Sequence, residues 1–149
     1  MRALTNRFPT AVLGAIAAML FLAFATRAQE AVPPQDAEAA RVVIEQQLTA
    51  FRAGNGEAAY SHAAPSIRRL YPTVERFMAM VETGYGVLTN PEAHVFGRNT
   101  SFGGEVHQEL IITGPDGKQW QAVYSLARQE DGSWKITGVK MNPYKGVTA

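Results

Sequence analysis

The clearest pattern in the chain is an alternation of apolar and polar residues between Gly104 and Asn142. This alternation predicts three successive strands, because consecutive side chains of a strand point to opposite faces. Two short segments interrupt it, 115–117 (Pro-Asp-Gly) and 130–132 (Glu-Asp-Gly), and their final glycines favour three-residue hairpin loops. The sequence therefore predicts an antiparallel meander whose register is determined by its loops.

The two loops predict which residues face each other across the strands. In the first hairpin the pairs are Ile112 with Trp120, Leu110 with Ala122, Gln108 with Tyr124 and Val106 with Leu126. In the second they are Leu126 with Ile136, Tyr124 with Gly138 and Arg128 with Trp134. Large apolar side chains then share an inner face that needs a cover. The outer face would carry, among polar side chains, Ile111, Val123, Val139 and Met141.

The region before the strands has helical spacing instead. A first helix is expected from Ala37, with Asp36 as N-cap, because apolar residues recur at Ala40, Ile44, Leu48 and Phe51. A shorter helix is expected over 57–63, ended by Pro65, and a third helix opens at Pro72 and Thr73. A first strand is expected over 93–98.

Helices followed by antiparallel strands indicate an α+β fold in which N-terminal helices pack on a curved antiparallel sheet. Three stretches resemble domain-of-unknown-function family 4864, found in secreted or periplasmic bacterial proteins: 63–67 (Ala-Ala-Pro-Ser-Ile), 77–81 (Phe-Met-Ala-Met-Val) with Tyr85, and 131–136 (Asp-Gly-Ser-Trp-Lys-Ile). The order of helices and strands also resembles the nuclear transport factor 2-like (SnoaL-like, cystatin-like) superfamily. This resemblance implies a cone-shaped fold that often encloses a pocket between helices and sheet, and it implies no reaction and no catalytic residues.

The first 28 residues differ from the rest of the chain. Arg2 and Arg7 precede an uncharged apolar run of 15 residues, Ala11 to Ala25. The pattern is typical of a secretory signal peptide, and the run is shorter than the roughly 20 residues of a membrane-spanning helix. We expect cleavage near Ala28, with cleavage after Ala25 or an uncleaved anchor as alternatives. The expected product is periplasmic or secreted and keeps no stable membrane anchor.

Charge and composition describe the remainder. Removal of residues 1–28 takes away three of the 14 basic side chains and none of the 13 acidic ones, so the net charge changes from +1 to −2. Nucleic acid is therefore not an expected partner. Residues 29–36 contain two prolines and are expected to form a mobile leader before a single domain over 37–145. The chain has no cysteine, so its stability must come from packing.

The candidate site lies on the inner face of the predicted sheet. Gln108, Tyr124 and Gly138 align across three strands, and the glycine leaves space beside the tyrosine ring. A phenol and an amide in a cavity wall suit a small ligand with an apolar body and one polar group. Alternatively, Tyr124 fills the space over Gly138 and Gln108 caps a backbone group. Tyr60 and His62, near the helix–sheet junction, complete the candidates.

Binding of a small apolar ligand, or an accessory role, is the favoured function, and two alternatives stay open. One is an interaction surface on the outer sheet face, with a second copy of the chain or another periplasmic protein as its partner. The other is a cofactor-independent isomerase or lyase with His62 or a glutamate as base, which rests on the superfamily resemblance alone. We expect no catalytic residue, no cofactor and no metal, because His107 and Glu109 share a strand face without the further ligands a metal needs.

Overall fold

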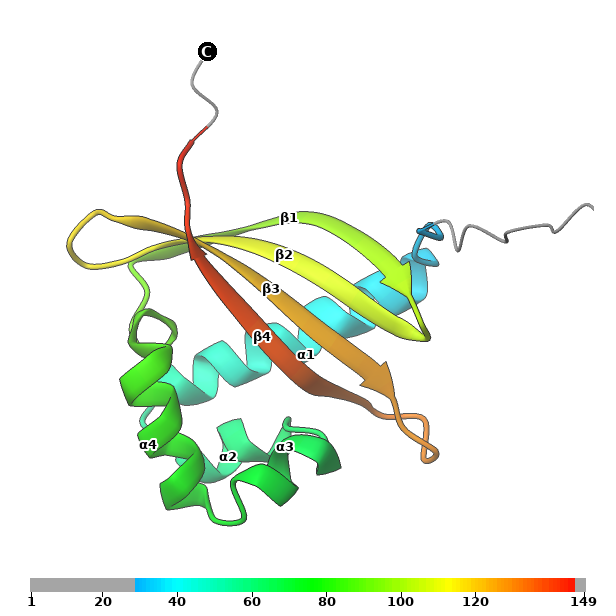
Figure 1. Ribbon diagram of the computed structural model, residues 1–149, viewed down its shortest axis with the longest axis horizontal. Helices are drawn as coiled ribbons and strands as arrows, with labels where there is room; N and C mark the ends of the chain where they lie inside the picture. Colours follow the sequence, from blue (N-terminus) through cyan, green and yellow to red (C-terminus); the bar gives the residue numbers. More distant parts are fainter. Residues whose placement is uncertain (1–28, 147–149) are drawn as a thin grey trace, which may run out of the picture.

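The computed structural model describes residues 29–146, where helices precede a four-stranded antiparallel sheet (Figure 1). The helices are α1 (Pro34–Arg52), α2 (Gly56–Ser61), α3 (Pro65–Leu70), α4 (Val74–Gly84) and the 3-10 helix η1 (Gly86–Leu88). The strands, in spatial order, are β1 (Ala93–Phe102), β2 (Glu105–Thr113), β3 (Gln119–Arg128) and β4 (Trp134–Pro143). The predicted α+β class is confirmed, whereas the predicted signal peptide lies outside the described residues.

The long helix α1 packs on the inner face of the sheet, and the other helices gather beside β4 (Figure 1). The predicted apolar stripe of α1 is buried: Ala40, Ile44, Leu48 and Phe51. It shares one core with inner-face residues of β2 and β3, among them Leu110, Ile112, Ala122 and Leu126. Burial of this apolar surface is the main stabilising contribution in a chain without disulfides.

Prolines lie at the starts of two helices, and both starts differ from the prediction. α1 begins at Pro34, and Asp36 lies in its first turn instead of capping it. Pro65, expected to end a helix, occupies the start of α3. Proline suits the first helical turn because the N–H groups there have no partner within the helix. The third helix was expected to open at Pro72 and Thr73; α4 begins at Val74, and Thr73 caps it, its hydroxyl accepting the backbone N–H of Arg76 at 3.2 Å.

The first hairpin has the predicted register, whereas the second departs from it inside β4. All four pairs predicted between β2 and β3 are present. In β4, Ile136 lies opposite Leu126 as predicted, but Gly138 lies opposite Ser125 and Val139 opposite Tyr124. The prediction that Gly138 faces Tyr124 is therefore wrong.

A β-bulge at Thr137 causes this departure. One extra residue lies in β4 between the pairs that involve Leu126 and Ser125, so the alternation of inward and outward side chains reverses beyond it. Val139 and Met141 consequently pack against the core. Their predicted position on the outer face is wrong, and that face is less apolar than expected.

β1 extends to Phe102, beyond its predicted end at Arg98, and it contains a register shift of its own between Phe96 and Asn99. Near its end, Ser101 exchanges two backbone hydrogen bonds with Glu30, at 3.2 and 3.1 Å. The segment before α1 is thus attached to one edge of the sheet.

β4 forms the opposite edge, and the turn between α2 and α3 covers its first half. The Ile136 N–H donates to the carbonyl of His62, and the Ala64 N–H donates to the carbonyl of Ile136, both at 2.8 Å. These bonds hold α3 beside β4, while the second half of the strand faces the space between α3 and α4.

Candidate functional site

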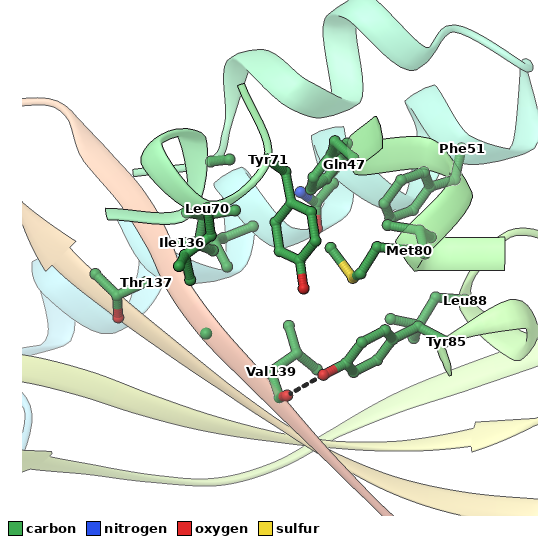
Figure 2. A pocket seen from close by; sticks show the side chains of 15 residues that line it. Gln47, Phe51, Leu70, Tyr71, Met80, Tyr85, Leu88, Ile136, Thr137 and Val139 are labelled. Atoms are coloured by element: carbon green, nitrogen blue, oxygen red, sulfur yellow. Dashed lines mark hydrogen bonds between the residues drawn. The ribbon is translucent and has the colours of Figure 1, made fainter. Parts of the chain in front are cut away.

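A pocket of about 220 Å³ lies between the helices and β4 (Figure 2). Its wall combines residues from α1, α3, α4, η1 and β4. The lining includes the apolar side chains Phe51, Ile67, Leu70, Phe77, Met80, Val81, Leu88, Ile136 and Val139. Uncharged polar residues complete it: Gln47, Tyr71, Tyr85 and Thr137. A concave, mostly apolar wall with a few polar groups is the usual composition of a small-molecule site.

Helix α4 provides one wall because its apolar residues recur at helical spacing. Phe77 and Val81 are buried in the core, and the Phe77 ring stacks on Phe51 of α1 at a centroid distance of 6.3 Å. Met80, on the same side of the helix, points into the pocket (Figure 2). Tyr85 follows the helix, and its hydroxyl donates to the carbonyl of Val139 at 3.2 Å, which joins α4 to β4.

The bulge at Thr137 shapes the opposite wall. It turns Val139 toward the pocket, whereas the Thr137 hydroxyl donates to the carboxylate of Glu105 at 2.6 Å. Gly138 between them also lines the pocket, and no atom lies within 4 Å of the position that a Cβ would take there. Of the five candidate residues from the sequence, only Gly138 lies in the pocket wall.

Gln108 is completely buried and caps irregular backbone of β1. Its amide nitrogen donates to the carbonyls of Gly97 at 3.1 Å and Arg98 at 3.3 Å, and to its neighbour Glu109 at 2.9 Å. Arg41 donates to its side-chain oxygen at 3.4 Å. These bonds correspond to the alternative considered from sequence, a buried amide that satisfies backbone groups.

Tyr124 faces Gln108 across the strands, and its ring is also completely buried. Its hydroxyl has no hydrogen-bond partner among residues 29–146. Burial raises the pKa of Tyr124, because the phenolate loses its hydration in these surroundings. Tyr124 does not line the pocket.

Tyr124→Phe is expected to reduce the loss of stability that the protein shows at high pH. An unfolded tyrosine ionises at a pKa of about 10, and the raised folded-state pKa means that the unfolded chain releases its proton first. Stability should therefore fall as the pH rises above about 10, by up to about 1.4 kcal/mol per pH unit. Tyr124→Phe should reduce this loss, and its stability at pH 7 should equal or exceed that of the native protein. Urea unfolding at pH 8 and pH 11 measures both effects. If the free energy of unfolding falls equally in the two proteins between these pH values, the raised pKa of Tyr124 is contradicted.

Tyr60 and His62 lie behind the pocket wall. The Tyr60 hydroxyl donates to the backbone carbonyl of Tyr71 at 2.7 Å, and the Arg68 guanidinium lies 4.6 Å from the centre of its ring. Burial, assisted by the positive charge of Lys135, lowers the pKa of His62. Tyr60 thus positions Tyr71 through its main chain, and neither Tyr60 nor His62 lines the pocket.

The outer sheet face carries a small polar cluster. His107 Nδ1 lies 2.9 Å from the hydroxyl of Ser125, and its Nε2 lies 4.0 Å from Glu105.

Within residues 29–146 there is no group of three or more acidic or histidine side chains arranged to hold a metal. In the same residues, no helix combines the length and the apolarity needed to cross a membrane.

Tyr71, Met80 and Tyr85 were absent from the sequence-derived candidates. Met80 and Tyr85 follow Phe77 at helical spacing, which indicates an apolar helix face but not a cavity against it. Tyr71 lies just after α3, and nothing in its sequence neighbours indicates that its ring turns toward β4. A residue that lines a cavity differs from a core residue only by the space left beside it.

Comparisons with known proteins support the fold. The family model for Domain of unknown function (DUF4864) matches residues 33–149, and none of the curated proteins matches the sequence. An NTF2-like protein of unknown function from Shewanella baltica OS155 has 11% identity and a TM-score of 0.53, covering 78% of this chain and 100% of that one. Another, from Silicibacter pomeroyi DSS-3, has 14% identity and a TM-score of 0.53, covering 76% and 100%. At such identities these similarities establish the fold alone, and they confirm the resemblance noted from sequence.

Proposed function

The chain belongs to the DUF4864 family, whose function is unknown, and we propose from the geometry of the pocket that it binds a small, mostly apolar molecule. The two similar NTF2-like structures are also of unknown function, so they suggest no role. The pocket between α3, α4 and β4 is the observation that supports this function. A ligand there would contact three helices and the edge strand together. The role is one of binding, with no chemical step assigned to the protein.

The wall of the pocket favours binding over the enzymatic alternative. An isomerase or lyase without a cofactor needs a carboxylate or an imidazole beside the reacting atoms. Within the described part of the chain, neither an acidic side chain nor a histidine lines the pocket, and His62 lies outside it. Its ionisable groups are two tyrosines, Tyr71 and Tyr85, which are weak bases when protonated.

Leu70 lines the pocket and is also exposed to solvent. Its side chain is 74% exposed although it lines the cavity. An apolar side chain at the mouth of a pocket gains burial when a ligand enters, and this favours binding. Its exposure also makes it a suitable position for mutation, because truncation there disturbs the folded protein little.

We expect Leu70→Ala to weaken the binding of a small hydrocarbon without destabilising the protein. Cumene (isopropylbenzene) is a suitable probe, and loss of the leucine contact should reduce its affinity by about threefold or more. The free energy of unfolding should change by less than about 0.5 kcal/mol. Val95→Ala is the matched control, because Val95 is 67% exposed and lies outside the pocket lining. Titration of cumene, followed by ¹H–¹³C spectra of the methyl groups, measures the affinity and locates the site.

This experiment can also refute the proposed function. Absence of cumene binding, or shifts confined to methyl groups outside the pocket, would exclude the pocket as a site for apolar molecules. Equal weakening by Leu70→Ala and Val95→Ala would indicate non-specific adsorption on exposed apolar groups.

We further propose that binding takes place in the periplasm or outside the cell, in line with the predicted signal peptide over residues 1–28. Fractionation of cells that express the full chain tests this proposal. A protein of unreduced mass in the cytoplasm would contradict it.

A further inference from the structure

Among residues 29–146, no charged side chain lines the pocket. All of its lining residues are apolar or carry uncharged polar groups. Transfer of a charged group from water into such surroundings costs much more free energy than transfer of a neutral polar group. A ligand that fits this wall is therefore neutral.

One side-chain donor of the wall, the hydroxyl of Tyr71, is free to bind a ligand. Figure 2 shows the Tyr71 hydroxyl pointing into the cavity, toward Met80 and Val139, without a hydrogen bond to any of the lining residues. The other side-chain donors are engaged: the hydroxyls of Tyr85 and Thr137 donate to Val139 and Glu105, and the Gln47 amide nitrogen donates to the carbonyl of Ala59 at 3.2 Å. A ligand oxygen that accepts the Tyr71 proton would leave no polar group unpaired at the contact.

The backbone of β4 provides a second donor on the same wall. In an antiparallel strand the N–H and C=O of one residue point to the same side. The Val139 carbonyl receives the hydroxyl of Tyr85 across the pocket, so it points away from β3. The Val139 N–H therefore also points away from β3, at the open edge of the strand.

The size of the cavity limits the rest of the molecule. An apolar cavity of about 150 Å³ in another protein holds benzene, and this pocket has a volume of about 220 Å³. The additional space accommodates a few non-hydrogen atoms beyond one six-membered ring.

We infer that the ligand is a neutral carbonyl compound (a ketone, ester or amide) of about the size of one substituted ring, with its oxygen bonded to the Tyr71 hydroxyl. This inference rests on the proposed function, because it assigns a chemical class to the same pocket. It makes Tyr71 the residue that determines specificity, while the apolar wall supplies most of the affinity.

Three probes with equal numbers of non-hydrogen atoms test the inference. Acetophenone carries a neutral carbonyl, cumene replaces this group by a hydrocarbon, and benzoate replaces it by a charged carboxylate. In the native protein at pH 7, benzoate should bind at least about tenfold more weakly than acetophenone. In Tyr71→Phe, the affinity for acetophenone should fall about fivefold relative to the affinity for cumene, which is the effect of one neutral hydrogen bond.

Tyr85→Phe is the matched control, because it removes a hydroxyl of the same pocket that is already bonded to Val139. The affinity ratio of acetophenone to cumene should change less than about twofold in this variant. Methyl spectra of both variants verify that the pocket is intact, so a general loss of packing cannot imitate the expected change in the ratio.

The outcomes distinguish a failure of the inferred ligand class from a failure of the proposed binding function. An unchanged ratio in Tyr71→Phe, with cumene still bound, would overturn the role of Tyr71 and leave the proposed function standing. Benzoate that binds as tightly as acetophenone would overturn the neutral class. If neither neutral probe binds the native protein, the proposed function itself fails.

Discussion

Replacement of Gln108 by leucine is expected to lower the free energy of unfolding by about 3 kcal/mol and the melting temperature by about 10 °C. Leucine has a similar size and no hydrogen-bonding group. The variant would leave the carbonyls of Gly97 and Arg98 without the amide that now donates to them at 3.1 and 3.3 Å. Each buried carbonyl without a partner costs about 1–3 kcal/mol, and the additional apolar contact of leucine offsets only part of that cost.

Gln119→Leu is the matched control, since Gln119 is exposed on β3 and its side chain makes one long hydrogen bond, 3.5 Å to Thr113. Its effect should be within about 0.5 kcal/mol. Urea unfolding followed by circular dichroism measures both variants. If Gln108→Leu is as stable as the native protein, water or another donor satisfies the carbonyls, and the amide is not what holds this part of β1.

Gln108 shows where reasoning from sequence succeeds and where it stops. The loop 115–117 predicts its partner in β3 correctly, because a short turn and an alternating pattern determine the register together. A buried amide between Val106 and Leu110 also indicates that some polar group must lie opposite it. The identity of that group depends on the register shift in β1, and neither the alternation nor a turn motif indicates this shift.

The pocket was less accessible to prediction than the core. The apolar stripe of α1 and the inner faces of β2 and β3 are visible as periodicities, because a buried face repeats along its element. The pocket instead depends on the distance between elements that are remote in sequence, such as Leu70 at the end of α3 and Val139 in β4. Its wall in β4 further depends on the bulge at Thr137, which reverses the pattern on which the prediction of the inner face relied.

The bulge also links stability to the site, because the residues that it turns inward serve both. Val139 packs against the core, lines the pocket and accepts the Tyr85 hydroxyl, so it joins β4 to α4. Met141, two residues further along, packs against the same core. A regular strand of this sequence would place both side chains on the outer face and leave the pocket without that wall.

Insertion of one alanine between Gly138 and Val139 is therefore expected to reduce the free energy of unfolding by about 3 kcal/mol or more. With the bulge kept, the extra residue would shift the alternation by one position and turn Val139 and Met141 outward. If the hairpin loop absorbed the shift, Trp134 and Ile136 would turn outward instead. Either change exposes two large apolar side chains, each worth about 1.5–3 kcal/mol when fully buried. The insertion should also abolish cumene binding, because the β4 wall of the pocket is displaced. Urea unfolding and the methyl titration measure the two effects.

Thr137→Ala separates the bulge itself from the side chain at its centre. This variant keeps the number of residues in β4 and loses only the 2.6 Å hydrogen bond to Glu105. Its cost should be about 1 kcal/mol, with cumene affinity unchanged, because the hydroxyl bonds to Glu105 rather than to a ligand. NOE contacts of Val139 with Tyr124 and of Ile136 with Leu126 should both persist in Thr137→Ala, whereas the insertion variant should lose one of them. Equal stability and equal binding in Thr137→Ala and the insertion variant would mean that β4 tolerates either register, and the inward position of Val139 would then arise from the packing of α4 rather than from the bulge at Thr137.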